Sequence, residues 1–170
     1  GYSPKLKKLK NGLEFDERAI DYLNEMLADA TLQGLSSVVC SAYRSVEYQQ
    51  ELFDNQVKKQ IANGLGISQA VVETKKVIAY PGTSEHNLGL AVDIVSLDYQ
   101  ILDEKQATTP EIEWLVEHCS EYGFILRYPK DKTEITGVIY EPWHFRYVGK
   151  QAAKDIMNDG ITLEEYLLGK

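Results

Sequence analysis

Two of the three histidines in the chain lie in settings that suit metal chemistry. His86 lies in a loop rich in Gly, Ser and Asn, and His144 follows the triplet 141–143. Asp93 lies inside the apolar run 90–95, where a carboxylate is costly unless it is paired or bound to a metal. Two imidazoles and a carboxylate form a ligand set used by catalytic zinc, which keeps a fourth position for water. The sequence therefore predicts a zinc site made by His86, Asp93 and His144.

Glu141 is the candidate general base beside this metal. A carboxylate there can take a proton from the attacking water and pass it to a leaving amine. In a regular strand, residues 141 and 144 would face opposite sides, so the chain must turn between them. Pro142 favours such a departure, and Gly89 would permit the bend that brings His86 toward Asp93.

Structural roles explain some of these residues taken singly. Asp93 could pair with Arg44 or Arg146 in an ordinary core, and His86 could cap a turn. The coincidence of four such residues favours a functional site. His118 lies in a predicted helix without a metal-binding partner at ligand spacing, so we interpret it as structural.

The elements that position these residues follow from apolar periodicity and from capping and turn residues. We expect helices over 16–33, 46–62, 68–80 and 110–122, and strands over 35–40, 90–95, 124–127, 138–140 and 144–148. Asp16 and Ser45 are the expected N-caps of the first two helices, and a charged hairpin over 129–137 joins two strands. One or two helices end the chain. We predict an irregular lead-in over 1–15 and a single domain over 16–170, an α+β fold with helices flanking a mainly antiparallel sheet.

Composition excludes several other functions. The chain is 44% hydrophobic and 26% charged, which suits a globular core. Its net charge of -8 repels nucleic acids and anionic lipid. No stretch approaches the ~20 apolar residues that span a bilayer, so we expect no membrane contact by this domain itself. Cys40 and Cys119 are expected to be free buried thiols, although a disulfide stays open. We expect a monomer, although the sequence does not specify the oligomeric state.

Two spaced motifs resemble the signature of the D-alanyl-D-alanine carboxypeptidases of the VanY type: Ser84-x-His86-x-x-Gly89-x-Ala91-x-Asp93 and Glu141-x-x-His144. The segments 41–45, 123–129 and 141–146 extend the resemblance over about 35–148. These enzymes share a zinc fold with lysostaphin-type enzymes and hedgehog domains. The resemblance therefore implies a hedgehog/DD-peptidase-like fold that binds Zn²⁺.

The resemblance also implies roles for single residues in a peptidase that trims peptidoglycan stem peptides. His86, Asp93 and His144 match the zinc ligands, Glu141 matches the general base, and Arg44 matches the cation that polarises the scissile carbonyl or holds a substrate carboxylate. Four further residues match the lining of the substrate pocket: Gln49, Ser84, Tyr128 and Trp143. The pair Asn87-Leu88 and Thr83 depart from close relatives at the pocket border, which leaves the exact substrate open.

The implied reaction removes the C-terminal D-alanine of the stem peptide, outside the cytoplasmic membrane of a bacterium. Whether the protein is secreted or anchored depends on residues upstream of Gly1. Three alternatives stay open: an L,D-carboxypeptidase that acts on the tetrapeptide stem, a peptidoglycan endopeptidase, and a non-catalytic zinc-binding module. Glu141 disfavours the last, since a purely structural site does not need a base beside an open metal position.

Overall fold

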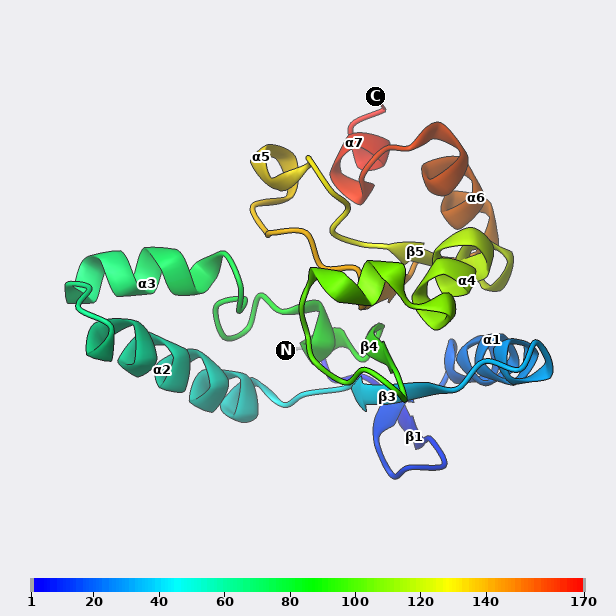
Figure 1. Cartoon of the computed structure of the whole chain (residues 1–170), viewed down its shortest axis with the longest axis horizontal. Coiled ribbons are helices and arrows are strands. Elements are labelled where there is room, and N and C mark those ends of the chain that lie inside the picture. The colour runs from blue at the N-terminus through cyan, green and yellow to red at the C-terminus, as the bar shows by residue number, and fades with distance from the viewer. Residues whose placement is uncertain (1, 170) are drawn as a thin grey trace.

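The centre of the molecule is a four-stranded antiparallel sheet with the strand order β3-β4-β6-β5. We describe residues 2–169 of a computed structural model, shown in Figure 1. The strands are β3 (Ser37–Ser41), β4 (Ala91–Ser96), β5 (Phe124–Leu126) and β6 (His144–Tyr147). All six residues of β4 are buried, which explains its nearly continuous apolar sequence. The predicted α+β class with an antiparallel sheet is confirmed.

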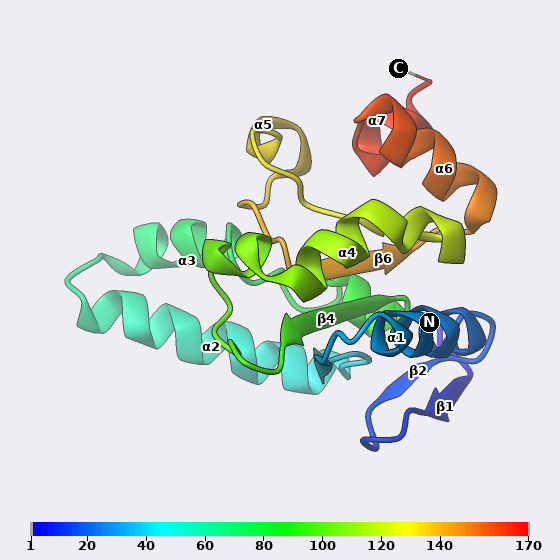
Figure 2. The same cartoon turned by 45° about the vertical axis from the view of Figure 1, so that its right-hand side comes forward.

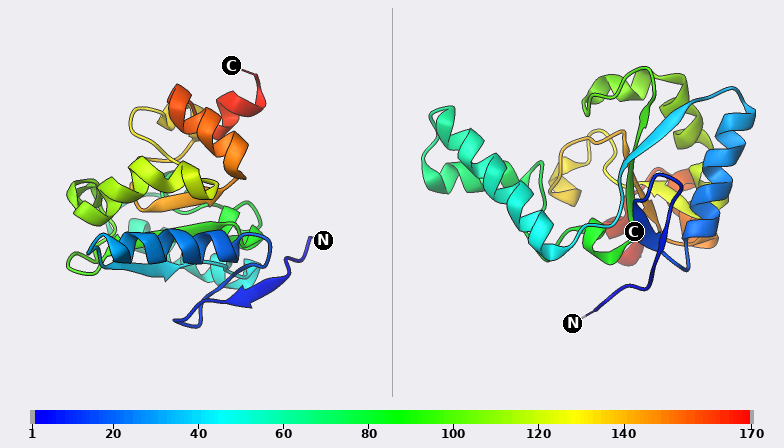
Figure 3. Two further views of the ribbon diagram at one scale, coloured as in Figure 1. Left: turned by 90° about the vertical axis from the view of Figure 1, so that its right-hand side faces the viewer. Right: turned by 90° about the horizontal axis from the view of Figure 1, so that it is seen from below.

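Helices α1 (Ile20–Leu32) and α4 (Pro110–His118) pack on one face of this sheet (Figures 2 and 3). Their apolar stripes meet the strand residues that alternate toward the same face. The shared core contains Leu23, Met26, Val92, Ile94, Ile112, Leu115, Phe124 and Phe145. Asp93 lies between Val92 and Ile94, and His144 directly precedes Phe145, so both point to the other face. One face of the sheet is therefore apolar, and the other carries Asp93 and His144.

Two pairs of helices extend beyond the sheet. Helices α2 (Val46–Ala62) and α3 (Ile67–Lys75) pack on each other and project away from the end that carries α1 (Figures 1 and 3). Helix α6 (Lys150–Asp159) packs on β5 through Ile125, Ala153 and Ile156, and α7 (Leu163–Leu167) follows it. Short helical turns complete the chain: η1 (Glu85–Leu88), η2 (Glu104–Thr108), η3 (Cys119–Tyr122) and α5 (Thr133–Thr136).

The irregular lead-in expected over 1–15 is wrong, because these residues contain most of a β-hairpin. Strands β1 (Leu6–Lys8) and β2 (Glu14–Asp16) pair in antiparallel register. Phe15 is fully buried and belongs to the main core, so hydrophobic burial holds the hairpin on the domain. Its backbone also donates from Asp16 N to Gly89 O over 2.9 Å, which ties the hairpin to the loop that carries His86.

Several expected boundaries also differ from the structure. Ser45 caps α2 as predicted, accepting from Tyr48 N, but Asp16 ends β2 and α1 begins after Ala19. The third helix ends at Lys75 rather than near residue 80. The strand expected over 138–140 is absent from the described chain, and its apolar residues form a loop instead; Val138 lines the cleft described below.

The two cysteines are free, as expected. Cys119 is buried, but the expected burial of Cys40 is wrong, because its residue is exposed on β3. Among the described residues, no helix has both the length and the apolar character needed to cross a membrane.

Candidate active site

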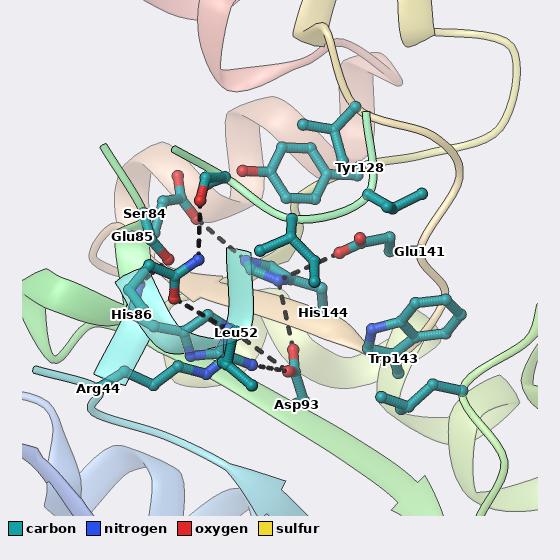
Figure 4. Close-up of a pocket in the computed structure, with 16 residues that line it drawn as sticks. Arg44, Leu52, Ser84, Glu85, His86, Asp93, Tyr128, Glu141, Trp143 and His144 are labelled. Atoms are coloured by element: carbon teal, nitrogen blue, oxygen red, sulfur yellow. Dashed lines mark hydrogen bonds and ion pairs between the residues drawn. The ribbon is translucent and has the colours of Figure 1, made fainter. Parts of the chain in front are cut away.

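One cleft of about 250 Å³ gathers every candidate site residue. Its walls come from β4, β6, η1, α2 and the loops between them (Figure 4). The predicted residues that line it are Arg44, Gln49, Ser84, His86, Asp93, Tyr128, Glu141, Trp143 and His144. Residues separated by up to a hundred positions therefore share one cavity.

His86 is held by the short turn η1. Ser84 caps this turn by accepting from His86 N over 3.3 Å, and Gly89 closes it in the left-handed region with a φ of 74°. The ring is buried, and its Nδ1 lies 2.7 Å from Ala42 O. A carbonyl only accepts hydrogen bonds, so Nδ1 carries the proton. Nε2 then keeps its lone pair, which can bind a metal. That nitrogen lies 3.3 Å from Asp93 Oδ2.

Asp93 and His144 are directly opposed residues of the antiparallel pair β4 and β6. Side chains in such positions point to the same face of a sheet and are close neighbours. His144 Nδ1 lies 3.3 Å from Asp93 Oδ1. Strand register therefore brings together two groups that are far apart in sequence.

A turn places Glu141 on the same side as His144. His144 N donates to Glu141 O over 3.2 Å, and β6 begins only at His144. Glu141 Oε2 lies 3.4 Å from His144 Nδ1, and Figure 4 shows both side chains directed into the cleft. The departure from strand geometry that Pro142 suggested is present.

Arg44 follows β3 and reaches Asp93 from the side. Its Nη2 lies 3.1 Å from Asp93 Oδ2, Nε donates to Ser41 Oγ over 2.8 Å, and Nη1 donates to Gln49 Oε1 over 3.3 Å. The pairing of Asp93 with Arg44, considered above as an alternative, is thus present together with the histidine cluster. Arg146 instead binds Glu85.

The residues fit a divalent metal. One ligand atom from each of His86, Asp93 and His144 lies within 4.8 Å of the others, and all three residues are buried. Asp93 Oδ1 has no hydrogen-bond partner among residues 2–169, which is costly for a buried carboxylate unless something else satisfies it. Two imidazoles and one carboxylate are the ligand set of zinc sites that leave a position open.

The pKa values of Asp93 and His144 are shifted in directions that suit binding of a cation. Burial raises the pKa of Asp93, but the neighbouring imidazoles of His86 and His144 outweigh it and hold the pKa well below its usual range. Burial likewise lowers the pKa of His144, yet the neighbouring carboxylates of Asp93, Glu141 and Glu85 raise that pKa well above its usual value. Both shifts favour a positive charge beside the Asp93 carboxylate.

The remaining predicted residues line the cleft in different ways. The ring of Tyr128 lies 4.8 Å from that of His144, and burial raises its pKa to about 12, so its hydroxyl stays neutral. Trp143 is buried beside Glu141 in the wall. Gln49 is fully buried, and its Nε2 donates to Ala79 O over 2.9 Å while its Oε1 accepts from Arg44.

Sequence reasoning did not single out Glu85 or the apolar rim of the cleft. Glu85 bonds to His144, 59 positions away, and no sequence spacing signals that contact. The apolar lining comes from Leu52, Val77, Ile78, Ala79, Leu102 and Val138. His118 lies outside the cleft, where it stacks on Trp114 with ring centroids 4.6 Å apart and bonds to Glu121. Its structural interpretation agrees with these contacts.

The comparison with known protein families decides which family has this site. The family described as VanY, D-alanyl-D-alanine carboxypeptidase, matches residues 12–150. The chain belongs to the VanY family. A D-alanyl-D-alanine carboxypeptidase of Enterococcus faecalis is 46% identical over 167 residues, which cover 98% of this chain and 60% of the relative. This VanY-family chain therefore spans less than two thirds of the length of that curated relative.

Solved structures of VanY proteins resemble the chain closely. VanYB in complex with D-alanine-D-alanine is 44% identical and aligns with a TM-score of 0.90. The alignment covers 99% of this chain and 91% of the other. A mutant of the vancomycin-resistance D,D-pentapeptidase VanY in complex with Zn(II) is also 44% identical, with a TM-score of 0.88 over 98% and 90% of the two chains. The predicted VanY-type fold is thus confirmed.

Proposed function

We propose that the chain is a zinc-dependent D,D-carboxypeptidase that removes the C-terminal D-alanine from peptidoglycan stem peptides. The observation that carries the proposal is the convergence of His86, Asp93 and His144 within 4.8 Å of one another, with the Glu141 carboxylate beside them. The similarity to VanY structures that hold Zn(II) and D-alanine-D-alanine supports the same metal and the same class of substrate.

The three residues of the cluster would hold the metal, His86 through Nε2 and His144 through Nδ1. Lewis acidity is the chemistry that a bound zinc ion supplies, and it polarises a peptide carbonyl and acidifies a water molecule. Glu141 accepts the proton of the attacking water and returns it to the departing amine of D-alanine. Glu141 lies next to His144, a proposed metal ligand. It would therefore lie close to a water molecule bound to the metal, and a proton transfer needs such a short distance.

Arg44 faces the charge that develops during hydrolysis. Its guanidinium is fixed by Ser41, Gln49 and Asp93 before substrate binds, so little reorganisation is needed as an oxyanion forms. Gln49 contributes by holding Arg44 and the backbone at Ala79. Ser84, Tyr128 and Trp143 supply the polar and aromatic walls against which the terminal residue of the substrate would lie.

The substrate sets the place of action. Stem peptides belong to the bacterial cell wall, so we propose that the chain works outside the cytoplasmic membrane, as one peptidase domain over residues 16–170 and as a monomer. The hairpin β1–β2 supports that domain from the N-terminal side through Phe15 and Gly89.

The test is mass spectrometry of synthetic stem peptides after incubation with the pure chain. We expect the pentapeptide to lose one D-alanine, with the tetrapeptide left intact, and we expect a chelator to stop the reaction. Loss of D-alanine from the tetrapeptide alone would make the chain an L,D-carboxypeptidase. Cleavage inside the stem would indicate an endopeptidase, and zinc binding without hydrolysis of any stem peptide would indicate a non-catalytic module.

A further inference from the structure

The ring of His144 is held at both of its nitrogens. Nε2 lies 3.2 Å from Glu85 Oε2, whereas Nδ1 faces Asp93 and Glu141 at 3.3 Å and 3.4 Å (Figure 4). A histidine that binds a metal is a neutral imidazole with a single proton, so donation from Nε2 to Glu85 would leave the lone pair of Nδ1 directed at the metal. Glu85 is the partner of Nε2 among residues 2–169, so it is the residue there that can select this tautomer.

The other histidine of the cluster is oriented in the opposite sense. His86 donates from Nδ1 to Ala42 O and turns Nε2 toward Asp93. A backbone carbonyl selects the tautomer of His86, and its place depends on the main chain alone. The tautomer of His144 depends on a side chain, and that side chain must itself be held in place.

Two arginines and a second carboxylate hold Glu85. Its Oε1 accepts from Arg127 Nε over 2.6 Å and from Arg146 Nη1 over 2.9 Å, which leaves Oε2 for His144. The remaining nitrogens of Arg127 donate to both carboxylate oxygens of Glu164 in α7, over 2.9 Å and 2.5 Å. Such two-point pairs between arginine and a carboxylate fix orientation as well as distance. The chain of contacts therefore runs from His144 to the last helix.

We propose that Glu85 is a positioning residue that fixes Nδ1 of His144 toward the metal, and that Glu164 of α7 supports it through Arg127. Helix α7 lies beyond residues 12–150, the part of the chain that the VanY family description matches. A segment outside that match thus contributes to the geometry of the metal site. The proposal rests on the proposed function, and it adds that Glu85 orients the metal ligand His144.

A purely structural role for Glu85 predicts different behaviour. Removal of one member of a buried ion cluster leaves uncompensated charge and lowers stability, but it does not alter metal affinity once the protein is folded. A positioning role lowers the affinity for zinc, because the ring of His144 loses the partner that sets its tautomer. Zinc affinity and the protonation of single ring nitrogens therefore separate the two roles.

The first measurement uses the zinc-loaded wild-type chain and needs no variant. A long-range ¹H–¹⁵N spectrum of the histidine rings reports which nitrogen carries the proton. We expect a protonated Nε2 in His144 and a protonated Nδ1 in His86. A protonated Nδ1 in His144 would overturn the proposal.

The second measurement compares zinc dissociation constants by competition with a chelator. Glu85→Ala should weaken zinc binding by about 10- to 100-fold. Glu85→Gln should weaken it as well, since its single amide oxygen cannot accept from both the arginines and His144 Nε2. Folded Glu85→Ala with wild-type zinc affinity and only a lower melting temperature would overturn the proposal. If Glu85→Ala does not fold, the same criterion applies to the isosteric Glu85→Gln.

A matched pair of variants tests the support from α7. Glu164→Gln should weaken zinc binding more than Glu165→Gln does. Glu165 lies on the same helix, caps it at Thr162 and binds Lys132, so its variant loosens α7 without removing a contact to Arg127. Equal zinc affinities in the two variants would refute the part of the proposal that concerns α7.

These measurements are independent of substrate. A wild-type chain that binds zinc with the expected ring protonation, yet leaves stem pentapeptide intact, would refute the proposed function and leave the role of Glu85 standing. The reverse result, hydrolysis with the opposite tautomer of His144, would refute the role of Glu85 alone.

Discussion

Glu141 and His144 are three positions apart, yet Glu141 Oε2 lies 3.4 Å from His144 Nδ1 because a turn through Pro142 precedes β6. This relationship places the proposed base beside a proposed metal ligand without making it a ligand itself. It also lets the two functions be separated by mutation, since binding of zinc and transfer of protons depend on different side chains.

Glu141→Gln should keep zinc and lose hydrolysis. We expect kcat to fall by about 10²- to 10⁴-fold, the range that general acid–base catalysis contributes, with zinc content unchanged by elemental analysis. Glu134→Gln in α5 is the matched control, because Glu134 is exposed and lies outside the cleft. Wild-type turnover in Glu141→Gln with zinc bound would contradict the assignment of the base.

Removal of the metal should abolish activity reversibly. Exhaustive dialysis against EDTA is expected to yield an inactive chain that recovers when zinc is added back, since the proposed ligands are side chains that remain in place. Asp93→Asn should bind zinc much more weakly, because an amide lacks the charge of the carboxylate. Asp98→Asn, at an exposed position just after β4, should behave as wild type. Full turnover after dialysis would refute the zinc mechanism.

Arg44→Lys should lower kcat/KM although the positive charge is kept. An ammonium group cannot make the separate contacts that the guanidinium makes with Ser41, Gln49 and Asp93. We expect a loss of roughly 10²-fold, comparable to the loss of one oxyanion donor, measured by steady-state hydrolysis of the pentapeptide. A loss of less than about threefold would show that Arg44 acts only through its charge.

Gly89→Ala should destabilise the loop that carries His86. Gly89 has a φ of +74°, and a Cβ there would lie 3.0 Å from Leu6 Cδ2 and 3.4 Å from Asp16 N. Gly82→Ala is the matched control, because Gly82 has a similar φ of +82° with no heavy atom within 4 Å. Each left-handed alanine costs about 1–2 kcal/mol, so thermal melting should show a greater loss for Gly89→Ala. Equal losses would mean that the contact with the hairpin is unimportant.

The pH dependence of stability should include a contribution from Asp16. Its hydrogen bonds with Arg18 lower its pKa below the ordinary 3.8, so the ionised carboxylate stabilises the folded chain above that pH. The contribution is lost as the pH falls through the lowered pKa. Asp16→Asn should therefore melt below wild type at pH 7, with a smaller difference near pH 3. A difference that stays constant across this range would contradict the electrostatic origin.

The sequence alone predicted a metal site because residue types that bind metals occur at positions where they are otherwise energetically unfavourable. A carboxylate inside the apolar run of β4 and two histidines in unusual settings indicated a metal, and local capping signals such as Ser45 placed α2 correctly. The same local signals misplaced the start of α1, since Asp16 pairs within β2 rather than capping a helix. Local patterns describe what a segment prefers, and tertiary burial of Phe15 decided otherwise.

Only the tertiary structure decided how the site is supported. The register that sets Asp93 opposite His144 and the contacts of Glu85 with His144, Arg127 and Arg146 join segments far apart in the chain. Such contacts leave no periodicity or spacing in one sequence, because they depend on which strands become neighbours after folding. Residue type therefore determined the chemistry, whereas the packing of the sheet determined which nitrogen of each histidine faces it.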